Sequence, residues 1–543
     1  MKTIHVTHRL FAGFAFLAQV PAASMPSKPS LPPGHSGDFL FDFRGDFFDD
    51  ERGHVVGGVV GDVLELQVQR LRHFEKNLFH DIRPHIGIFP RVHRFGWLRG
   101  CVDFLDGFSI SSDEVRRQLQ EFQPDYIGLS IRNIDDMVKG STHSYIPGIL
   151  ETYLAPIKEQ SRAVLILGGS GFTIFPDELM TVFGADFGIT GEAEEAFPLL
   201  LQALELGGDP SQIEGVVLPG KKVTGKTRPS LLLNAPFSSD LDTLLNYAPY
   251  SERGAYPIQT KRGCVHRCIY CSYPILEGRT FRKRTAVHVV DEIETTRNRI
   301  QNPGLVFEFV DSTFNDPPGH AEAICEEIIR RNLRVTLRTM GMNPVNINGN
   351  LLGLMKQAGF AQIDSTPDSA SPVMLKNYGK NFTIAHLQKA AQLIREYAMP
   401  TMWFFIFGGP GETEETLLES FAFIDRFIHQ DDMVHITEGL RIYPRTPLAE
   451  LAIKEGLIQK ETSLLSPLFY VSSQLGDAEL ANIITREIAT HPNCIRLTES
   501  RPPPELLQAA LRERKEKNLT EPMFRTLLRL KRQCTQGEKV DLR

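Results

Sequence analysis

Three cysteines lie within one short stretch, KRGCVHRCIYCSYP, at Cys264, Cys268 and Cys271. The whole chain of 543 residues contains only seven cysteines, and the other four stand singly. Because the thiolate of cysteine is both a metal ligand and a nucleophile, three thiols at this spacing predict a metal or redox site.

Three kinds of site compete for these thiols. A structural zinc site takes four ligands, typically as two pairs, and although His266 lies between the cysteines, no second pair follows. A thioredoxin-like redox pair would use Cys268 and Cys271 and leave Cys264 idle. A [4Fe-4S] cluster normally takes four cysteines, so three would leave one iron open to an exogenous ligand, as catalytic metal sites require.

The elements around the thiols predict a barrel. A series of strands and helices begins at YPIQTKRGC, directly before the first cysteine. Six such units over residues 250–448 predict a partial (β/α)6 barrel, whose chemistry lies on the loops after the strands. The five further strands are expected in LVFEFVDS, RVTLRTMG, FAQIDSTPD, TMWFFIFGGP and HITEGLRIYP. Residues 449–543 are expected to be mainly helical.

A second α/β domain is predicted before the barrel. Strands alternate with helices over residues 111–226, which predicts a doubly wound, Rossmann-like sheet with its ligand at the carboxyl ends of the strands. The segment IEGVVLPGKKVTG reads as a closing hairpin, and the Pro-rich residues 227–249 as a linker. Residues 1–110 are atypical because they keep no sustained period of 2 or 3.6, and their beginning resembles a short secretory signal.

Composition narrows the function classes. The formal net charge of -7 argues against a general nucleic-acid surface. The odd, scattered cysteines argue against a disulfide framework and favour a reducing, cytoplasmic location. No stretch after the N-terminal segment approaches the roughly 20 apolar residues of a membrane span.

The cysteine spacing, its place after the first barrel strand and Tyr270 beside the last thiol resemble the radical S-adenosylmethionine (SAM) enzymes. The resemblance covers most of residues 245–450. In that family the CxxxCxxC motif holds a [4Fe-4S] cluster whose open iron chelates the amino and carboxylate groups of SAM. It implies Cys264, Cys268 and Cys271 as metal ligands, an external electron donor such as flavodoxin or ferredoxin, and cleavage of SAM to a 5'-deoxyadenosyl radical.

The same resemblance nominates further residues of the barrel. The glycines of FIFGGPGET would meet adenine, and the segment QIDSTPDSAS occupies the place of the family's ribose-binding strand, although its residues depart from the usual pattern. The cofactor-binding candidates in the barrel are Tyr270, Arg338, Asp364, Asp368, Ser369, Gly408 and Gly409. The catalytic candidates are Glu308, Asp311, Arg441 and Tyr443.

The domain before the barrel resembles the cobalamin-binding domain of one subclass of these enzymes. The matched residues, which would line the nucleotide tail of cobalamin, are Ser130, Gly168, Gly169, Ser170, Gly191 and Glu192. Glycines after a strand let a bulky ligand approach the backbone. The family's Asp-x-His-x-x-Gly motif is absent, and His54, His80 and His85 do not replace it, so cobalamin would have no protein ligand on its lower face.

The resulting hypothesis is a cobalamin-dependent radical SAM enzyme, a C-methyltransferase that acts on an unactivated carbon of a small molecule. One alternative is a cyclase or rearrangement enzyme of the same architecture, such as the anaerobic porphyrin-ring cyclases. A methylthiotransferase would need an additional N-terminal trio of cysteines and a basic RNA-binding module, neither of which is evident. The non-enzyme alternative is a structural zinc protein.

Overall fold

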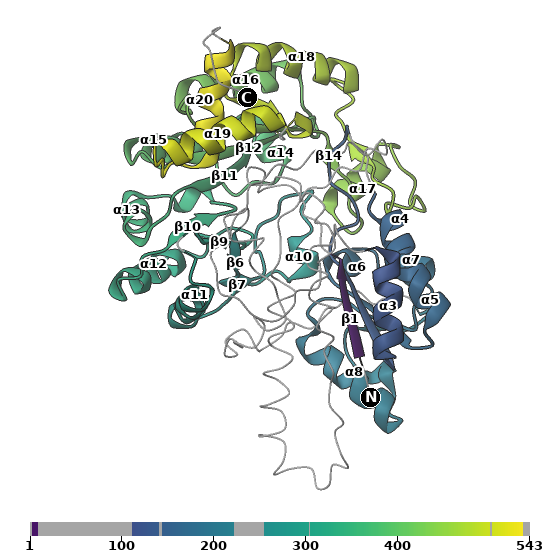
Figure 1. Cartoon of the computed structure of the whole chain (residues 1–543). Helices are drawn as coiled ribbons and strands as arrows, with labels where there is room; N and C mark the ends of the chain where they lie inside the picture. The colour runs from purple at the N-terminus through teal and green to yellow at the C-terminus, as the bar shows by residue number, and fades with distance from the viewer. Residues whose placement is uncertain are drawn as a thin grey trace.

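A computed structural model of the chain describes residues 3–8, 111–140, 144–221, 255–302, 304–499 and 502–535 (Figure 1). The predicted linker at 227–249 lies outside the described residues, as do His54, His80 and His85. Among the described residues, no helix is long and apolar enough to cross a membrane.

The first domain is built on a five-stranded sheet with its strands in chain order. β1 (Thr3–His8), β2 (Tyr126–Ile131), β3 (Val164–Gly168) and β4 (Phe187–Ile189) are parallel, and β5 (Val216–Val217) is antiparallel to β4. The first strand therefore comes from the region that sequence periodicity left without a pattern. The second half of the expected closing hairpin lies outside the described residues.

Helices cover both faces of this sheet, as the doubly wound prediction requires. Because side chains alternate along a strand, Ile127 and Leu129 of β2 face one layer and Tyr126 faces the other. The first layer contains α3 (Ser112–Phe122), α5 (Ala155–Gln160) and α7 (Pro176–Phe183), and the opposite layer contains α8 (Ala193–Leu206). Ser111 caps α3 by accepting a hydrogen bond from the Glu114 backbone N–H at 3.2 Å.

The second domain is the predicted partial barrel of six parallel strands. In order around the barrel they are β6 (Tyr256–Ile258), β9 (Val306–Phe309), β10 (Thr336–Thr339), β11 (Ile363–Asp368), β12 (Thr401–Phe407) and β13 (Met433–Glu438). Isolated parallel bridges, Leu337 with Phe360 and Met342 with Ser365, join the β10 side to the β11 side.

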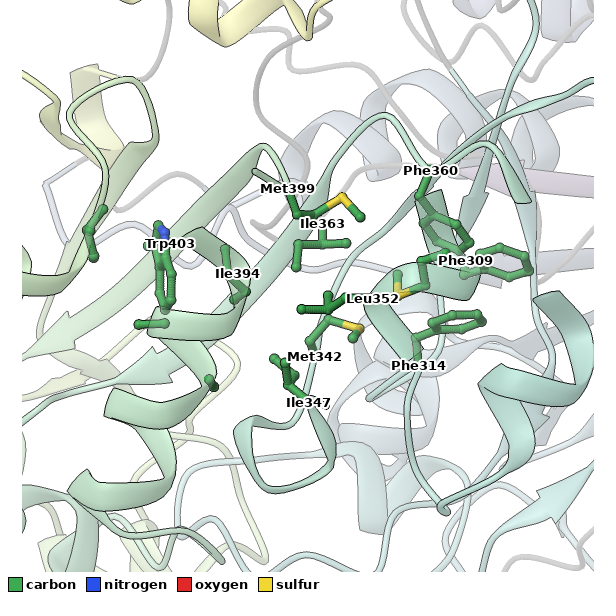
Figure 2. Close-up of a cluster of buried hydrophobic side chains, with 14 of the residues drawn as sticks. Phe309, Phe314, Met342, Ile347, Leu352, Phe360, Ile363, Ile394, Met399 and Trp403 are labelled. Carbon is green, nitrogen blue, oxygen red and sulfur yellow. The ribbon is translucent and has the colours of Figure 1, made fainter. Parts of the chain in front are cut away.

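Helices pack around the outside of the barrel and bury its main apolar core. The helices are α11 (Ala286–Ile300), α12 (His320–Arg330), α13 (Gly349–Ala358), α15 (Ile384–Glu396) and α16 (Glu414–Phe427). Figure 2 shows the centre of this core, where the rings of Phe309 and Phe314 stack with centroids 4.4 Å apart and Phe360 packs beside them. Trp403 lies in the same core, so its side chain serves packing.

The C-terminal region is mainly helical, and its parts pack in three different places. α18 (Asp477–Thr490) and β16 (Cys494–Arg496) extend the barrel, because β16 adds a further parallel strand to β13. α19 (Pro504–Glu516) and α20 (Met523–Thr535), drawn in yellow in Figure 1, cover one end of the barrel.

The segment from β14 to β15 packs against the first domain. It comprises β14 (Leu440–Arg441), α17 (Pro447–Lys454) and β15 (Phe469–Tyr470), and its buried side chains share one apolar cluster with those of β2, β3 and α7. Figure 1 shows α17 beside the first domain. The two domains are therefore joined through a continuous core.

The remaining elements are short. They are α4 (Ile146–Ile149), η1 (Leu150–Leu154), α6 (Ser170–Ile174), η2 (Pro210–Gln212), β7 (Lys261–Arg262), α10 (Tyr273–Leu276), β8 (Arg282–Lys283), η5 (Pro344–Asn346), α14 (Pro372–Asn377) and η6 (Leu497–Glu499).

Candidate functional site

The three cysteines occupy the loop between β7 and α10, directly after the first barrel strand. Cys264 is buried, and Cys268 and Cys271 are half-buried. Burial raises the pKa of all three thiols, and for Cys268 the nearby Lys380 ammonium partly opposes that rise. Among the described residues, no group of His, Cys, Asp and Glu side chains is placed to hold a metal ion, so the thiols do not form a preformed single-ion cage.

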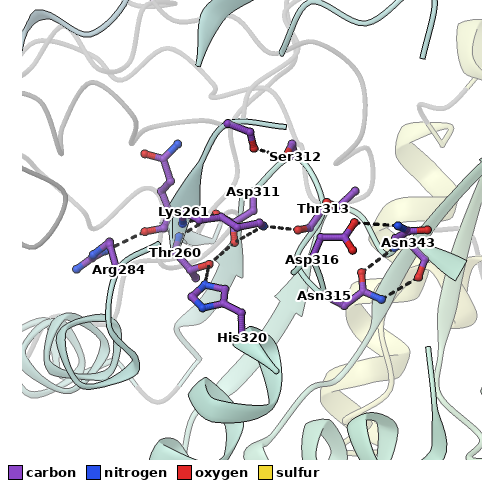
Figure 3. A network of polar contacts seen from close by, with 12 residues as sticks. Thr260, Lys261, Arg284, Asp311, Ser312, Thr313, Asn315, Asp316, His320 and Asn343 are labelled. Atoms are coloured by element: carbon purple, nitrogen blue, oxygen red, sulfur yellow. Dashed lines mark hydrogen bonds and ion pairs between the residues drawn. The ribbon is translucent and has the colours of Figure 1, made fainter. Parts of the chain in front are cut away.

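Asp311 fixes the start of the cysteine loop. Its Oδ1 accepts hydrogen bonds from the backbone N–H groups of Thr260 at 2.8 Å and Lys261 at 3.1 Å, and its Oδ2 accepts one from the Thr260 hydroxyl at 2.6 Å (Figure 3). The Lys261 ammonium is buried 3.7 Å from the same carboxylate and donates to the Thr313 carbonyl. The side chain of Asp311, a predicted catalytic residue, thus positions the cysteine loop by binding the backbone that precedes it.

Gly263 forms a tight link between β7 and Cys264. Its φ is +90°, and a Cβ atom there would lie 2.0 Å from the Thr280 carbonyl oxygen, so only glycine fits. Its N–H donates to the Glu277 carboxylate at 2.9 Å, and the Cys264 N–H donates to the Gly278 carbonyl at 3.1 Å. These contacts hold the backbone that carries the first thiol in a fixed conformation.

A second polar anchor lies beyond the first thiol. His266 Nε2 and Asp316 Oδ2 are 2.7 Å apart. The Asn343 side chain donates to the same Asp316 oxygen at 2.9 Å (Figure 3). Burial raises the pKa of Asp316, but the hydrogen bonds from His266 and Asn343 outweigh burial and lower it. Asn315 exchanges two hydrogen bonds with the Asn343 backbone, so it supports this anchor.

The second and third thiols are flanked by a buried ionic group. Tyr270 donates a hydrogen bond to Asp368, and the Lys380 ammonium contacts the same carboxylate at 2.5 Å and the Tyr270 hydroxyl at 3.3 Å. Burial lowers the pKa of Lys380, but Asp368 and then Cys268 raise it above its ordinary value. Sequence reasoning predicted Tyr270 and Asp368 but missed Lys380, which follows Asp368 by 12 residues.

Three other predicted residues meet inside the barrel. Arg338 and Glu308 are cross-strand partners on β10 and β9, and their side chains form an ion pair at 2.6 Å. Burial and then the Glu308 charge raise the pKa of Asp364 well above its ordinary range, while Arg338 opposes this. The guanidinium of Arg338, a predicted cofactor-binding group, is therefore paired with a protein carboxylate.

The residues predicted to contact the nucleoside of SAM have packing partners of their own. The Ser369 and Ser420 hydroxyls lie 3.1 Å apart in the interior. A Cβ on Gly409 would lie 2.0 Å from the ring of Tyr378, and Gly408, with φ of +93°, donates its N–H to Glu412 at 3.1 Å. Tyr378 and Glu412 were not predicted. Burial raises the pKa of Glu412 to about 7.

The carboxyl edge of the first sheet forms a cradle of small residues. The Ser130 hydroxyl at the end of β2 is buried and has no hydrogen-bond partner among the residues that the structure describes. Gly169, just after β3, has φ of +94°, and a Cβ there would lie 2.5 Å from the Ile131 carbonyl oxygen and 2.7 Å from Ser130 Oγ. An unsatisfied buried hydroxyl beside a half-buried glycine backbone fits a polar ligand such as the nucleotide tail of cobalamin.

The other predicted residues of this edge are engaged within the protein. The Ser170 hydroxyl donates to the Arg132 carbonyl at 3.0 Å, and the N–H of Gly191 donates to the Thr173 hydroxyl at 2.9 Å. The Glu192 carboxylate pairs with Arg262 at 2.8 Å, directly before the cysteine loop. The edge predicted for cobalamin therefore contacts the loop predicted for the cluster.

Arg441 and Tyr443, predicted as catalytic, lie at a second junction of the domains. Arg441 pairs with Asp135 of the first domain at 2.8 Å and lies over the ring of Tyr443, 4.9 Å from its centroid. Tyr443 packs against Phe175. A second arginine of this junction, Arg445, donates to the Thr173 carbonyl of α6 at 2.6 Å. The side chain of Arg441 thus mainly joins the two domains.

Family models match both domains. The model of the radical SAM superfamily matches residues 258–424, and the model of the B12 binding domain matches residues 96–201. The chain therefore contains a radical SAM domain preceded by a B12-binding domain. The second match begins before residue 111, where sequence reasoning placed the start of the domain.

Individual relatives include methyltransferases, magnesium-protoporphyrin cyclases and a putative methylthiotransferase of Methanocaldococcus jannaschii. The chain is 26% identical to the tryptophan 2-C-methyltransferase of Streptomyces laurentii over 409 residues, 62% of this chain and 67% of the relative. It is 27% identical to the anaerobic magnesium-protoporphyrin IX monomethyl ester cyclase of Rubrivivax gelatinosus over 350 residues, 59% of this chain and 58% of that enzyme.

A solved structure shares the whole architecture. The radical SAM methyltransferase TsrM from Kitasatospora setae, whose structure contains cobalamin and a [4Fe-4S] cluster, aligns with a TM-score of 0.69 at 21% identity. The alignment covers 88% of this chain and 96% of that one. This likeness supports the fold of both domains.

Proposed function

We propose that the protein is a cobalamin-dependent radical SAM enzyme that methylates an unactivated carbon of a small molecule. One observation carries the proposal: the loop with Cys264, Cys268 and Cys271 meets the glycine-rich edge of a B12-binding domain through the contact of Arg262 with Glu192. A chemistry that needs both cofactors needs their sites to lie close together, and the contact of Arg262 with Glu192 supports such an arrangement of the two proposed sites.

The proposed roles follow from the contacts. Cys264, Cys268 and Cys271 would hold the [4Fe-4S] cluster, and Ser130, Gly168 and Gly169 would receive the tail of cobalamin. When bound, the two groups would supply one-electron reduction of SAM and donation of a methyl group. Asp311 fixes the backbone before the first thiol, and Asp368, Tyr270 and Lys380 hold the loop at the second and third thiols.

The cluster would need an external one-electron donor, such as a flavodoxin or a ferredoxin. The cysteine loop carries an exposed apolar residue, Val265, and an exposed cation, Arg267, beside the second thiol. Such a surface suits a small acidic electron carrier. Purified flavodoxin with its reductase should therefore support turnover in place of a chemical reductant such as dithionite. The turnover rate with flavodoxin should fall as salt is added.

The test of the methyltransferase proposal is anaerobic reconstitution with iron, sulfide and cobalamin, followed by incubation with a metabolite extract and SAM labelled in its methyl group. Label in a carbon-bound methyl of a product supports the proposal. Reconstituted protein that binds both cofactors but transfers no label to carbon contradicts it.

A second candidate function is cyclisation or oxidative rearrangement, which the likeness to the magnesium-protoporphyrin IX monomethyl ester cyclases favours. The same incubation separates the two. A cyclase would release 5'-deoxyadenosine and give an unmethylated product, whereas a C-methyltransferase would give a methylated one.

A further inference from the structure

Four charged residues form a buried cluster where the first domain meets the cysteine loop. Arg262 binds two carboxylates of the first domain, Glu192 at 2.8 Å and Glu194 at 2.6 Å, and Arg282 also pairs with Glu192. The side chains of Arg262, Glu192 and Glu194 are only 2%, 7% and 0% exposed. We call these residues, Arg262, Arg282, Glu192 and Glu194, the Arg262 cluster.

On the barrel side the cluster is tied rigidly to the first thiol. Arg262 precedes Cys264 by two residues, and the intervening Gly263 is locked by its positive φ and by the Thr280 carbonyl. The Arg262 Nε also donates to the Gln259 side chain at 3.0 Å. A shift of the guanidinium would therefore move the backbone that carries Cys264.

On the other side the cluster is tied to the predicted cobalamin edge. Glu192 is the residue before α8 and follows Gly191, whose N–H is fixed by Thr173. Glu194 lies in the first turn of the same helix. A ligand that orders the loop after β4 would therefore order both carboxylates.

The arginine pair at the base of the cysteine loop depends on these carboxylates. Arg262 and Arg282 are direct partners across the antiparallel strands β7 and β8, and like charges directly opposite each other are destabilising. Glu192 contacts both guanidinium groups, at 2.8 Å for Arg262 and 3.0 Å for the Nη1 of Arg282. A carboxylate of one domain thus lets the hairpin of the other domain close.

We propose that the Arg262 cluster couples the two cofactor sites, so that cobalamin on the first domain and the iron-sulfur cluster on the thiols strengthen each other's binding. Arg262 is a positioning residue in this scheme, because it acts through Gly263 and the cysteine loop. The inference rests on the proposed function, since it requires both cofactors. Coupling of this kind is reciprocal by thermodynamic necessity.

The experiment measures cobalamin binding by its visible absorbance, with the full-length protein in two states, reconstituted with the iron-sulfur cluster and freed of it by chelation. The ratio of the two dissociation constants is the coupling factor. For the wild type we expect cobalamin to bind about 5-fold or more tightly to the reconstituted protein, the lower range of measured couplings.

Arg262→Lys should bring the coupling factor close to one, because a single ammonium cannot hold two carboxylates in the fixed geometry of a guanidinium. Glu194→Gln keeps the size of the side chain and should also lower the coupling factor. If Arg262→Lys does not fold, the coupling factor of Glu194→Gln tests the proposal. Asp135→Asn is the matched control. It weakens another buried contact between the domains, with Arg441, and should leave the factor unchanged.

The outcomes separate the two proposals. A wild type that takes up either no cluster or no cobalamin overturns the proposed function and this inference with it. A wild type that binds both with a factor of one overturns only the coupling, as does a folded Arg262→Lys or Glu194→Gln protein with the wild-type factor. Loss of the factor in these variants but not in Asp135→Asn supports it.

Discussion

The two edges proposed to bind the cofactors are built by opposite means. The thiol rim of the barrel is crowded with ionic groups, since Asp311, Asp316 and the pair of Asp368 with Lys380 each hold part of the cysteine loop. The edge of the first sheet instead relies on a residue without a side chain, Gly169, and on the Ser130 hydroxyl, which has no hydrogen-bond partner among the described residues.

The difference teaches what each edge is prepared to bind. Thiolates have to be held at fixed positions against their own repulsion, so the rim uses charges and hydrogen bonds to define them. A large, preformed ligand instead needs room and a few donors, so its edge uses glycine. Damage to the rim should therefore abolish a function, whereas damage to the glycine edge should weaken binding by degrees.

The largest effect is expected from Cys264→Ala, Cys268→Ala and Cys271→Ala combined. This variant should lose reductive cleavage of SAM to the level of a control without enzyme, because the barrel then offers no thiolates. The measurement is 5'-deoxyadenosine released under anaerobic reduction. Cleavage that survives in the triple variant would refute the site. Replacement of the distant Cys325 by Ala is the control and should leave cleavage intact.

Lys380→Met tests whether charge defines the rim. The variant leaves the buried Asp368 carboxylate without its cation, and removing one partner of a buried pair costs about 3–5 kcal/mol of stability. The free energy of unfolding in urea and the iron content after reconstitution should both fall. The exposed Lys376 is the matched control, and Lys376→Met should change stability by less than about 0.5 kcal/mol. Equal effects of the two substitutions would contradict the role of Lys380.

Gly169→Ala tests the glycine edge. The new methyl would meet the Ile131 carbonyl oxygen at 2.5 Å with the backbone at φ of +94°, which costs about 1–3 kcal/mol. Cobalamin affinity should fall while the iron-sulfur site still assembles, as judged by absorbance titration and iron content. Gly148→Ala is the control, because a Cβ there meets nothing within 4 Å. Unchanged cobalamin affinity in Gly169→Ala would remove this edge from the binding site.

His435 lies in a third, apolar environment. It stacks on Phe404 with ring centroids 4.7 Å apart, and within the described part of the chain neither ring nitrogen has a hydrogen-bond partner. Burial lowers its pKa to about 3, so the folded protein keeps it neutral while the unfolded chain takes up a proton below its ordinary pKa. Its stabilising contribution is thus complete above about pH 6.5 and is lost as the pH falls toward 3.

The loss from this one group should reach about 2 kcal/mol at pH 5. The measurement is the free energy of unfolding in urea at pH 7 and pH 5, for the wild type and for His435→Phe. The variant should lose less stability between the two pH values than the wild type, and a parallel loss in both proteins would contradict the assignment.

The smallest effect is expected from Ser130→Ala, and it should have opposite signs in two assays. Removing a buried hydroxyl that lacks a partner should leave the free protein as stable or stabilise it by about 1 kcal/mol. The same change should weaken cobalamin binding by several-fold, about the worth of one hydrogen bond. Thermal unfolding of the free protein and absorbance titration measure the two effects. A loss of stability in the free protein would show that Ser130 has a partner within the protein.

Sequence reasoning could predict the fold because the periodicities are local. Six barrel strands and the doubly wound sheet follow from apolar runs such as TMWFFIF and YIGLSI, which need no knowledge of their neighbours. It could not predict that Thr3–His8 pairs with β2, since the pairing residues lie more than a hundred positions apart and the sequence up to residue 110 carries no clear period.

The same division holds for the site. Cys264, Cys268 and Cys271 were predictable because their chemistry lies in one short spacing. The engagement of Glu192 by Arg262, and of Arg441 by Asp135, was not, because an ion pair between distant segments leaves no mark in either one. Lys380 and Tyr378 were missed for a related reason, since their roles depend on which loop they face once the chain has folded.

The segment from β14 to β15 has a practical consequence for anyone who wants to study the halves separately. Its α17 belongs to the apolar interior of the first domain although it follows the barrel in the chain. A fragment that stops before residue 440 would expose the surface that Leu448 and Ala452 now cover, and should aggregate. Dissection of this enzyme should therefore graft residues 440–470 onto the N-terminal piece.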